Sequence, residues 1–356
     1  MKKLYVVVAV LVVAAMLMPA CTPTAPDCTQ PDVFCVGMVT DVGKIDDKSF
    51  NQSAWEGLQQ AKSDGVADWV QYIETTDAKD YDKNIATFAD AGYDAIVTVG
   101  FALGTATATA AVAYPDIYFI GVDQFQEWPF DADTSNDIAN LAGLNFPEDQ
   151  AGFLVGALAA MMSETGKIGS VCATDAVPPV WRFGEGFRAG AAYIDPNVEV
   201  FVVYHSDVGF DKTFTDPEWA AATADSMIAN GADVIFGAGG KTGNGAVTQA
   251  AQAGVYAIGV DTDQYYTLPE AAPMMLSSAL KLITPGVADL IAQAKDAQAG
   301  TAAFPAGNYA GLAGYAPYHD LEDVVPDEVK TRMEEIQTML QSGELTTGVA
   351  PVKPAE

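Results

Sequence analysis

From residue 35 onwards, short apolar segments alternate along the chain with longer segments that have the pattern of helices, and this alternation limits the possible folds most strongly. Apolar runs without polar alternation are typical of strands in a parallel sheet, which helices cover on both faces. A repeated strand–helix order predicts such sheets. The sequence therefore predicts an α/β protein. The expected strands cover residues 36–39, 70–74, 95–99, 117–120, 138–144, 168–173, 198–204, 234–236 and 256–260.

The chain is long enough for two lobes of this kind, and three crossovers between them would form a hinge. The apolar helix expected over 149–163 opens the second lobe. Polar residues interrupt it on both sides before it reaches the length of a membrane span, so we expect it to be buried. The expected parts are a first lobe over 34–143 and 281–306, a second lobe over 144–280 and 307–346, and a tail over 347–356.

The start of the chain has the pattern of a processing segment. Two lysines precede an apolar run over 4–17, which is too short for a comfortable membrane span. Ala20 and Cys21 follow, and a small residue before a cysteine is what lipoprotein signal peptidase requires. We therefore expect a signal peptide over 1–20, lipid attachment to Cys21 and a flexible tether over 21–33. An ordinary secretory signal peptide is the alternative.

The other cysteines suggest a disulfide rather than a metal site. Cys28 and Cys35 flank a short loop in a secreted context, so we expect a bridge between them. Cys172 lies in an apolar strand and is expected to be a buried free thiol. The two histidines, His205 and His319, form no cluster with metal-ligand spacing. We therefore expect no metal and no cofactor.

The chain is strongly acidic, with a formal net charge of -30. Binding to nucleic acid requires clustered Lys and Arg, so this composition argues against a nucleic-acid partner. It also disfavours a strongly anionic ligand. Half of the residues are hydrophobic, which is enough for sizeable cores.

A turn rich in Gly and Asp joins the first strand to its helix. In an open α/β sheet such a turn lies at the carboxyl end of the strand, where ligands bind. Phe50 stands at the helix start beside Asp41 and Asn51, so its ring could stack on a flat ligand while the polar neighbours hydrogen-bond it. The alternative is that Phe50 packs on the sheet and the acidic residues only cap the helix.

Two partial motifs carry less weight. The run from Gly239 to Thr242 looks like the end of a P-loop, but Ile235 stands where that motif requires glycine, so we expect a strand-to-helix turn instead. The acidic run from Asp41 to Asp47 is similar to the aspartate cluster of calcium-dependent nucleoside hydrolases. Hydrolysis requires convergent carboxylates or a metal, and the rest of the sequence supplies no such set.

Several longer motifs occur in order between about residue 35 and residue 285. They are 36–52 with 55–57, 120–123, 153–156, 213–217, 242–245, 258–265 and Lys281. Together they resemble the basic membrane protein family of extracytoplasmic substrate-binding lipoproteins of ABC importers. The best understood members bind purine nucleosides. The resemblance implies a type I periplasmic-binding-protein fold and a lipid-anchored monomer that delivers a purine nucleoside to an ABC permease, without enzymatic activity.

The resemblance also implies roles for individual residues. Phe50 and Phe214 match the family's two stacking aromatics, and backbone near Gly240 would contact the ribose. This sequence has Lys241 where relatives have threonine after the glycine pair, so Gly239 is the alternative to Gly240. The polar ligand-binding residues implied are Asp41, Asn51, Asp123 for the base edge, Asp261 for the ribose hydroxyls and Lys281 for the sugar. Trp181 and Tyr265 are weaker expectations for the rim.

Three alternatives remain open at this level. The same fold could bind another small ligand, such as a sugar or an autoinducer. The protein could be a nucleoside hydrolase, or a surface receptor that senses its ligand without transport. Paired aromatic residues favour a flat base over a sugar alone.

Overall fold

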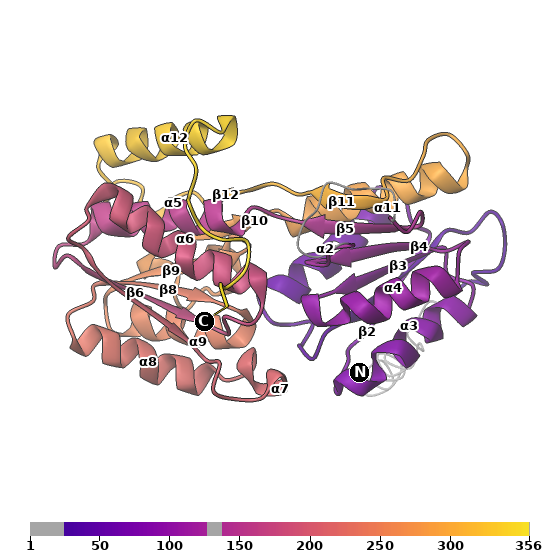
Figure 1. Cartoon of the computed structure of the whole chain (residues 1–356), viewed down its shortest axis with the longest axis horizontal. Coiled ribbons are helices and arrows are strands. Elements are labelled where there is room, and N and C mark those ends of the chain that lie inside the picture. Colours follow the sequence, from indigo (N-terminus) through magenta and orange to yellow (C-terminus); the bar gives the residue numbers. More distant parts are fainter. Residues whose placement is uncertain (1–24, 127–136, 356) are drawn as a thin grey trace, which may run out of the picture.

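The computed structural model describes residues 25–126 and 137–355 of the chain, which form two α/β lobes side by side (Figure 1). Each lobe is built around a six-stranded sheet, and this confirms the predicted fold class. The expected signal peptide, Cys21 and the first residues of the tether lie outside the described residues.

The sheet of the first lobe is parallel throughout, in the order β11-β5-β4-β3-β1-β2. Helices α2 and α11 pack on one face, and α3 and α4 pack on the other. The central strands are therefore buried on both sides, as their apolar runs predict. The strands are β1 (Cys35–Thr40), β2 (Trp69–Ile73), β3 (Ala95–Val99), β4 (Tyr118–Val122), β5 (Leu141–Asn145) and β11 (Gly307–Ala310). The helices are α2 (Phe50–Ser63), α3 (Tyr81–Asp90), α4 (Gly104–Ala113) and α11 (Ile283–Gln298).

The sheet of the second lobe has the order β12-β10-β9-β8-β6-β7, and only its β12–β10 pair is antiparallel among the described strands. One face carries α5 and α6, and the other carries α8 and α9. The strands are β6 (Lys167–Cys172), β7 (Glu199–Tyr204), β8 (Val234–Ala238), β9 (Tyr256–Asp261), β10 (Met275–Lys281) and β12 (Ala313–Tyr315). The helices are α5 (Glu148–Met162), α6 (Pro178–Ile194), α7 (Phe210–Thr213), α8 (Pro217–Ala229), α9 (Gly240–Gln252), α10 (Gln264–Thr267) and α12 (Asp327–Ser342).

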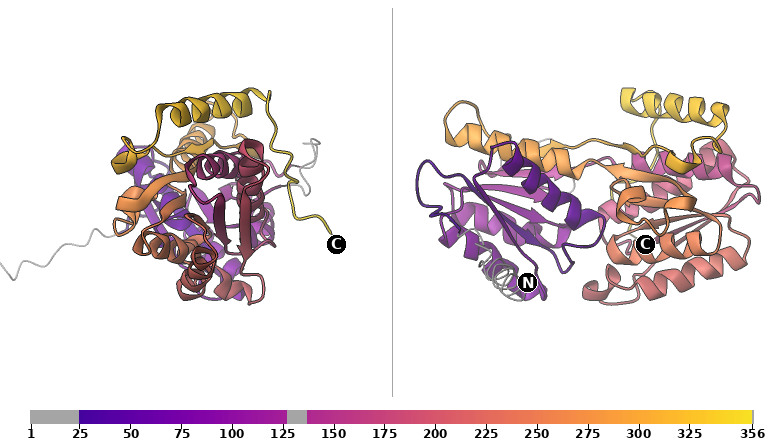
Figure 2. Two further views of the ribbon diagram at one scale, coloured as in Figure 1. Left: turned by 90° about the vertical axis from the view of Figure 1, so that its left-hand side faces the viewer. Right: turned by 180° about the vertical axis from the view of Figure 1, so that it is seen from behind.

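The chain passes between the described lobes three times, after β5, after β10 and after β11. The right view of Figure 2 shows the two lobes side by side from behind, with α12, in yellow, on the outside of the second lobe. The expected division differs from the two sheets at three boundaries. Strand β5 of the first sheet extends to Asn145, Lys281 ends β10 of the second sheet, and the segment from residue 307 belongs to the first sheet. Strand β11 pairs with β5 in the first sheet before the chain crosses to β12.

The apolar helix α5 is buried within the second lobe, as predicted. It packs on α6 at very close range, because glycines allow the two backbones to meet. A Cβ atom on Gly156 would lie 2.0 Å from the carbonyl oxygen of Phe187, and one on Gly190 would lie 1.9 Å from that of Phe153. In the part of the chain that the structure describes, no helix is long and apolar enough to cross a membrane.

The three cysteines that the structure describes have the expected states. Cys28 and Cys35 form a disulfide, which ties the segment before β1 to the start of that strand. Cys172 is free and completely buried at the end of β6.

A candidate ligand cleft between the lobes

A cleft lies between the lobes, where the carboxyl ends of the parallel strands of both sheets meet. It holds ≈ 710 Å³ of empty volume, including open solvent at its mouth. In open α/β sheets ligands bind at this edge, in the crevice outside the carboxyl ends of the strands. The structure brings all eight expected ligand-binding residues to its wall. They are Asp41, Phe50, Asn51, Asp123, Phe214, Gly240, Asp261 and Lys281.

The first wall comes from the turn after β1 and the start of α2. The Asp47 carboxylate accepts hydrogen bonds from the backbone N–H groups of Ser49, Asn51 and Gln52, at 3.0, 2.8 and 3.1 Å. It thereby satisfies N–H groups that have no partner within the helix. Asp47 is therefore the acidic residue of this turn that caps the helix. This cap fixes the helix start that carries Phe50 and Asn51 to the cleft.

Two strand ends contribute carboxylates in the same unusual backbone conformation. Asp123 follows β4 with φ 59° and Asp261 ends β9 with φ 66°. Aspartate tolerates this left-handed region better than most residues, and such conformations cluster at functional sites. Each residue is 5% exposed. The Oδ2 atom of Asp261 accepts a hydrogen bond of 2.5 Å from the Ser49 hydroxyl of the other lobe.

Lys281, at the end of β10, is at the centre of a buried ion network. Its Nζ lies 2.5 Å from Asp123 Oδ2 and 2.9 Å from Glu148 Oε1, and Arg182 also pairs with Glu148. Burial alone would lower the pKa of Lys281, but the neighbouring carboxylates outweigh it and raise this pKa overall. Burial would likewise raise the pKa of Glu148, but Lys281 and Arg182 outweigh it and lower this pKa. Both groups are therefore held in their charged forms.

For two other carboxyl groups of the cleft, burial outweighs the nearby charges and hydrogen bonds, and their pKa values are raised. Burial raises the pKa of Asp41 to about 7, since the hydrogen bond from Asn51 compensates only in part. It also raises the pKa of Asp123 to about 7, against the opposing charge of Lys281. One oxygen of Asp123 is buried without a hydrogen-bond partner within the described structure. The cleft therefore offers an acceptor that a ligand's N–H or O–H group could satisfy.

The second wall comes from the loop before α8 and the start of α9. Phe214 and Gly240 touch there, and a Cβ atom on Gly240 would lie 3.2 Å from the Phe214 carbonyl oxygen. Gly239 has φ 113°, a backbone conformation that requires glycine, and Gly240 has φ 56°, in the left-handed region that favours glycine. Both glycines line the cleft.

Hydrogen bonds across the cleft hold the first wall against the second lobe. The Asn244 side chain donates to the Asp47 carbonyl at 2.6 Å. Gln264 and Thr267 donate to the Lys48 carbonyl at 3.1 and 2.9 Å. The turn before α2 is therefore positioned by both lobes.

Sequence reasoning missed several residues of this region. Glu148 begins a helix that is mostly apolar after its first turn, and its burial beside Lys281 depends on residues far away in the chain. Phe101 and Phe183 also line the cleft. Phe101 lies two residues after the end of β3, and that position could have identified it. Trp181 and Tyr265, expected at the rim, are not among the described residues that line the cleft. Trp181 stacks on Tyr204, and Tyr265 stacks on His319.

Two parallel-sheet lobes, three crossovers and a polar and aromatic cleft define the class of two-lobed solute-binding proteins with the type I periplasmic-binding-protein fold. The family model described as "ABC transporter substrate-binding protein PnrA-like" matches residues 34–305. The chain belongs to this family, the Bmp family, and is a substrate-binding protein of an ABC transporter.

Individual relatives agree with this assignment. The CD4+ T-cell-stimulating antigen of Listeria monocytogenes is 31% identical over 341 residues, which cover 90% of this chain and 89% of that protein. The ABC transporter nucleoside-binding protein BmpA of Lactococcus lactis is 28% identical over 327 residues, 87% of each chain. A crystal structure of a solute-binding protein from Aeropyrum pernix has a TM-score of 0.72 at 25% identity, covering 88% of this chain and 92% of that one.

Proposed function

We propose that this protein binds a purine nucleoside in the cleft and delivers it to an ABC permease. The observation that carries the proposal is the lining of the cleft, which combines a phenylalanine from each lobe with buried carboxylates from both. Phe50 and Phe214 would stack on the two faces of the base. Each stacking contact on an aromatic ring contributes ~1–3 kcal/mol.

The polar residues would bind the base edge and the ribose. Asp123, with its unpartnered oxygen, would accept hydrogen bonds from the base edge, assisted by Asp41 and Asn51. Asp261 would accept from the ribose hydroxyls, and Lys281 and Gly240 would contact the sugar. The name of the Lactococcus relative, a nucleoside-binding protein, supports the same ligand class.

Ligand contacts from both lobes would favour the closed arrangement, since the complete set exists only when the lobes meet. Binding in this way involves no covalent chemistry, so we propose that the protein is not an enzyme. We also propose that it acts as a monomer and has no nucleic-acid partner, in keeping with its net charge of -30.

Titration calorimetry with inosine, guanosine, adenosine, cytidine and hypoxanthine tests the ligand class. We expect binding of purine nucleosides, with weaker binding of cytidine and of the free base. A protein that binds none of the five would contradict the proposal. Chromatography after incubation with inosine separates binding from hydrolysis, because a hydrolase would release hypoxanthine.

We further propose that the mature protein is anchored outside the cytoplasm by lipid on Cys21. The support is the sequence around this residue, with Ala20 before it and a short apolar run upstream. Cys21→Ser should release the protein from the membrane fraction, while Cys172→Ser should leave it there. Mass spectrometry that finds a mature N-terminus elsewhere, without lipid, would contradict this anchor.

A further inference from the structure

The segment that joins β7 to α8 brings Phe214 to the cleft, and its position is fixed on both sides of this residue. Before it, the Thr213 hydroxyl donates to the backbone carbonyls of Ala173 and His205, the latter at 2.9 Å. These two carbonyls lie at the ends of neighbouring strands of the second sheet. Thr213 is 2% exposed, so this anchor is shielded from water.

After Phe214, the chain is held through Asp216 and the start of α9. The Thr242 N–H donates to the Phe214 carbonyl at 3.3 Å, and the Thr242 hydroxyl accepts from the Asp216 N–H at 2.9 Å. The Asp216 carboxylate caps α8 by accepting from the Trp219 N–H at 3.2 Å. Asp216 thus links two supports of this segment. Its carboxylate caps α8, and its backbone N–H binds Thr242, which in turn binds the Phe214 carbonyl.

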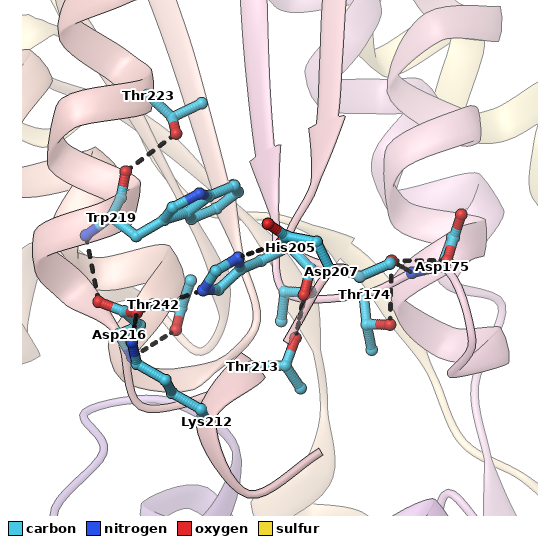
Figure 3. A network of polar contacts seen from close by, with 12 residues as sticks. Thr174, Asp175, His205, Asp207, Lys212, Thr213, Asp216, Trp219, Thr223 and Thr242 are labelled. Carbon is cyan, nitrogen blue, oxygen red and sulfur yellow. Dashed lines mark hydrogen bonds and ion pairs between the residues drawn. The ribbon is translucent and has the colours of Figure 1, made fainter. Parts of the chain in front are cut away.

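His205 orients this carboxylate from the core (Figure 3). Its ring is 2% exposed and stacks on the Trp219 indole, with centroids 3.8 Å apart and an interplanar angle of 12°. Its Nε2 lies 3.2 Å from Asp216 Oδ2, and its Nδ1 lies 3.0 Å from Asp207 Oδ1. A carboxylate oxygen only accepts, so each ring nitrogen bonds its carboxylate as a donor when it carries a proton.

The two carboxylates that face His205 differ in what they support. The Asp207 side chain is 77% exposed, whereas that of Asp216 is 13% exposed and holds the cap described above. Lys212 is a second cation near Asp216 Oδ2, at 3.0 Å, but its side chain is 60% exposed. A hydrogen bond from a buried, stacked ring restricts a carboxylate more than an ion pair with an exposed, flexible lysine.

We propose that His205 is a positioning residue for ligand binding, which holds Phe214 at the cleft by donating from Nε2 to Asp216. The inference rests on the proposed nucleoside-binding function for its affinity readout. Loss of this donor frees the Asp216 carboxylate to rotate. The Trp219 N–H then loses its fixed partner and the cap of α8 weakens. The segment between Thr213 and α8 is then less firmly held, so the ring of Phe214 is no longer fixed against the ligand.

A matched pair of substitutions separates the two ring nitrogens. The amide nitrogen of glutamine reaches the position of Nε2, and that of asparagine reaches the position of Nδ1. His205→Gln therefore keeps the donor to Asp216, and His205→Asn keeps only the donor to Asp207. Both variants lose the ring stack on Trp219, so any loss of stability from the missing stack is the same in both. His205→Phe keeps a ring on Trp219 but gives neither carboxylate a donor.

We expect His205→Gln to bind inosine nearly as wild type does in titration calorimetry. His205→Asn and His205→Phe should bind about tenfold more weakly, because a hydrogen bond to a charged group is lost. Lys212→Met, the control that removes the exposed cation, should bind nearly as wild type. Equal affinities of the Gln and Asn variants, or wild-type affinity in His205→Phe, would overturn the proposal.

Hydrogen exchange without ligand separates this inference from the nucleoside hypothesis. In His205→Asn and His205→Phe, the amides of residues 214–219 should exchange faster than in wild type and in His205→Gln. If wild type binds no nucleoside but this exchange pattern appears, the proposed function fails and the positioning role stands. Identical exchange in all four proteins would overturn the positioning role.

Discussion

Burial changes the pKa values of individual carboxyl groups in the cleft. Asp41, Asp47 and Asp123 have pKa values raised by burial, to about 7, 6 and 7. Burial therefore favours the protonated forms of these groups relative to water, and the cleft is less anionic than its composition suggests. A protonated carboxyl group donates as well as accepts hydrogen bonds, which suits a neutral ligand with mixed polar edges.

The pKa of Asp41 predicts how stability depends on pH. The folded state holds the proton more tightly than the unfolded state, so the carboxyl group stabilises the fold at low pH. This contribution is lost as pH rises from about 4, the unfolded pKa, through about 7, the folded one. Asp41→Asn should therefore gain free energy of unfolding relative to wild type between pH 5 and pH 8. Urea unfolding at several pH values measures the difference.

The control for this prediction is Asp64→Asn, at an exposed position after α2. Its difference from wild type should not grow over this pH range. A difference between Asp41→Asn and wild type that stays constant from pH 5 to pH 8 would show that Asp41 does not titrate there.

Phe214 is the single side chain on which the proposed stacking most depends in the second lobe. Phe214→Ala should raise the Kd for purine nucleosides about 10- to 100-fold, because one stacking face of ~1–3 kcal/mol is lost. Calorimetry measures the change, with Tyr266→Ala as the control. Tyr266 is 71% exposed and is not among the described residues that line the cleft. Wild-type affinity in both Phe214→Ala and Phe50→Ala would rule out the stacking arrangement.

At the scale of elements, α2 shows how one cap serves both the fold and the site. Three backbone N–H groups at its start converge on Asp47, and this start presents Phe50 and Asn51 to the cleft. From the second lobe, the side chains of Asn244 and Gln264 donate hydrogen bonds to backbone carbonyl groups of the same turn. The helix start is therefore fixed from within by its cap and from outside by the opposite lobe.

Asp47→Ala should lower the free energy of unfolding by about 1–2 kcal/mol, the usual cost of losing a helix cap. It should also weaken nucleoside binding, because Phe50 and Asn51 lose their fixed position. Asp46→Ala is the matched control, since Asp46 is exposed and pairs only with Lys241 in the described structure, at 2.8 Å. Urea unfolding and calorimetry compare the two. Equal effects of the two substitutions would contradict the assigned cap.

At the scale of the whole molecule, the ion network of Lys281 connects the lobes beside two of the three crossovers. Asp123 follows β4 of the first sheet. Lys281 ends β10 and Glu148 begins α5, and both of these elements belong to the second lobe. The network thus links the side chains of both lobes where the chain itself passes between them. Its charges are compensated only while the lobes keep this arrangement.

Lys281→Met should lower the free energy of unfolding by about 3 kcal/mol, because removal of one partner leaves buried carboxylates uncompensated. Adding Asp123→Asn should restore part of the loss, since one of these carboxylates is then absent. Lys79→Met, which removes an exposed ion pair with Asp77, should change stability little. Urea unfolding measures all three. If Lys281→Met is as stable as Lys79→Met, the network contributes nothing to the fold.

Much of the architecture could be predicted from the sequence because its causes are local. Apolar runs of strand length, helix periodicity between them and glycines at strand-to-helix turns determine the two parallel-sheet lobes. The disulfide between Cys28 and Cys35 could be expected because the two residues are close in sequence. Family motifs pointed to the eight residues that the fold brings to the cleft, and their roles toward a ligand stay a prediction.

The tertiary structure alone decided which of these groups meet. Strand β11 joins the first sheet through its backbone pairing with β5, and its short Gly- and Ala-containing sequence carries no periodicity that predicts this. Glu148 and Lys281, like His205 and Asp216, become partners through their positions in the folded chain. Periodicity and capping act over a few residues, whereas burial, ion pairing and pKa depend on distances in space. The sequence thus determined the helices, the strands and the side chains that can bind a ligand. The packing of the two lobes decided which charges are compensated and which buried polar atoms have no hydrogen-bond partner in the described structure.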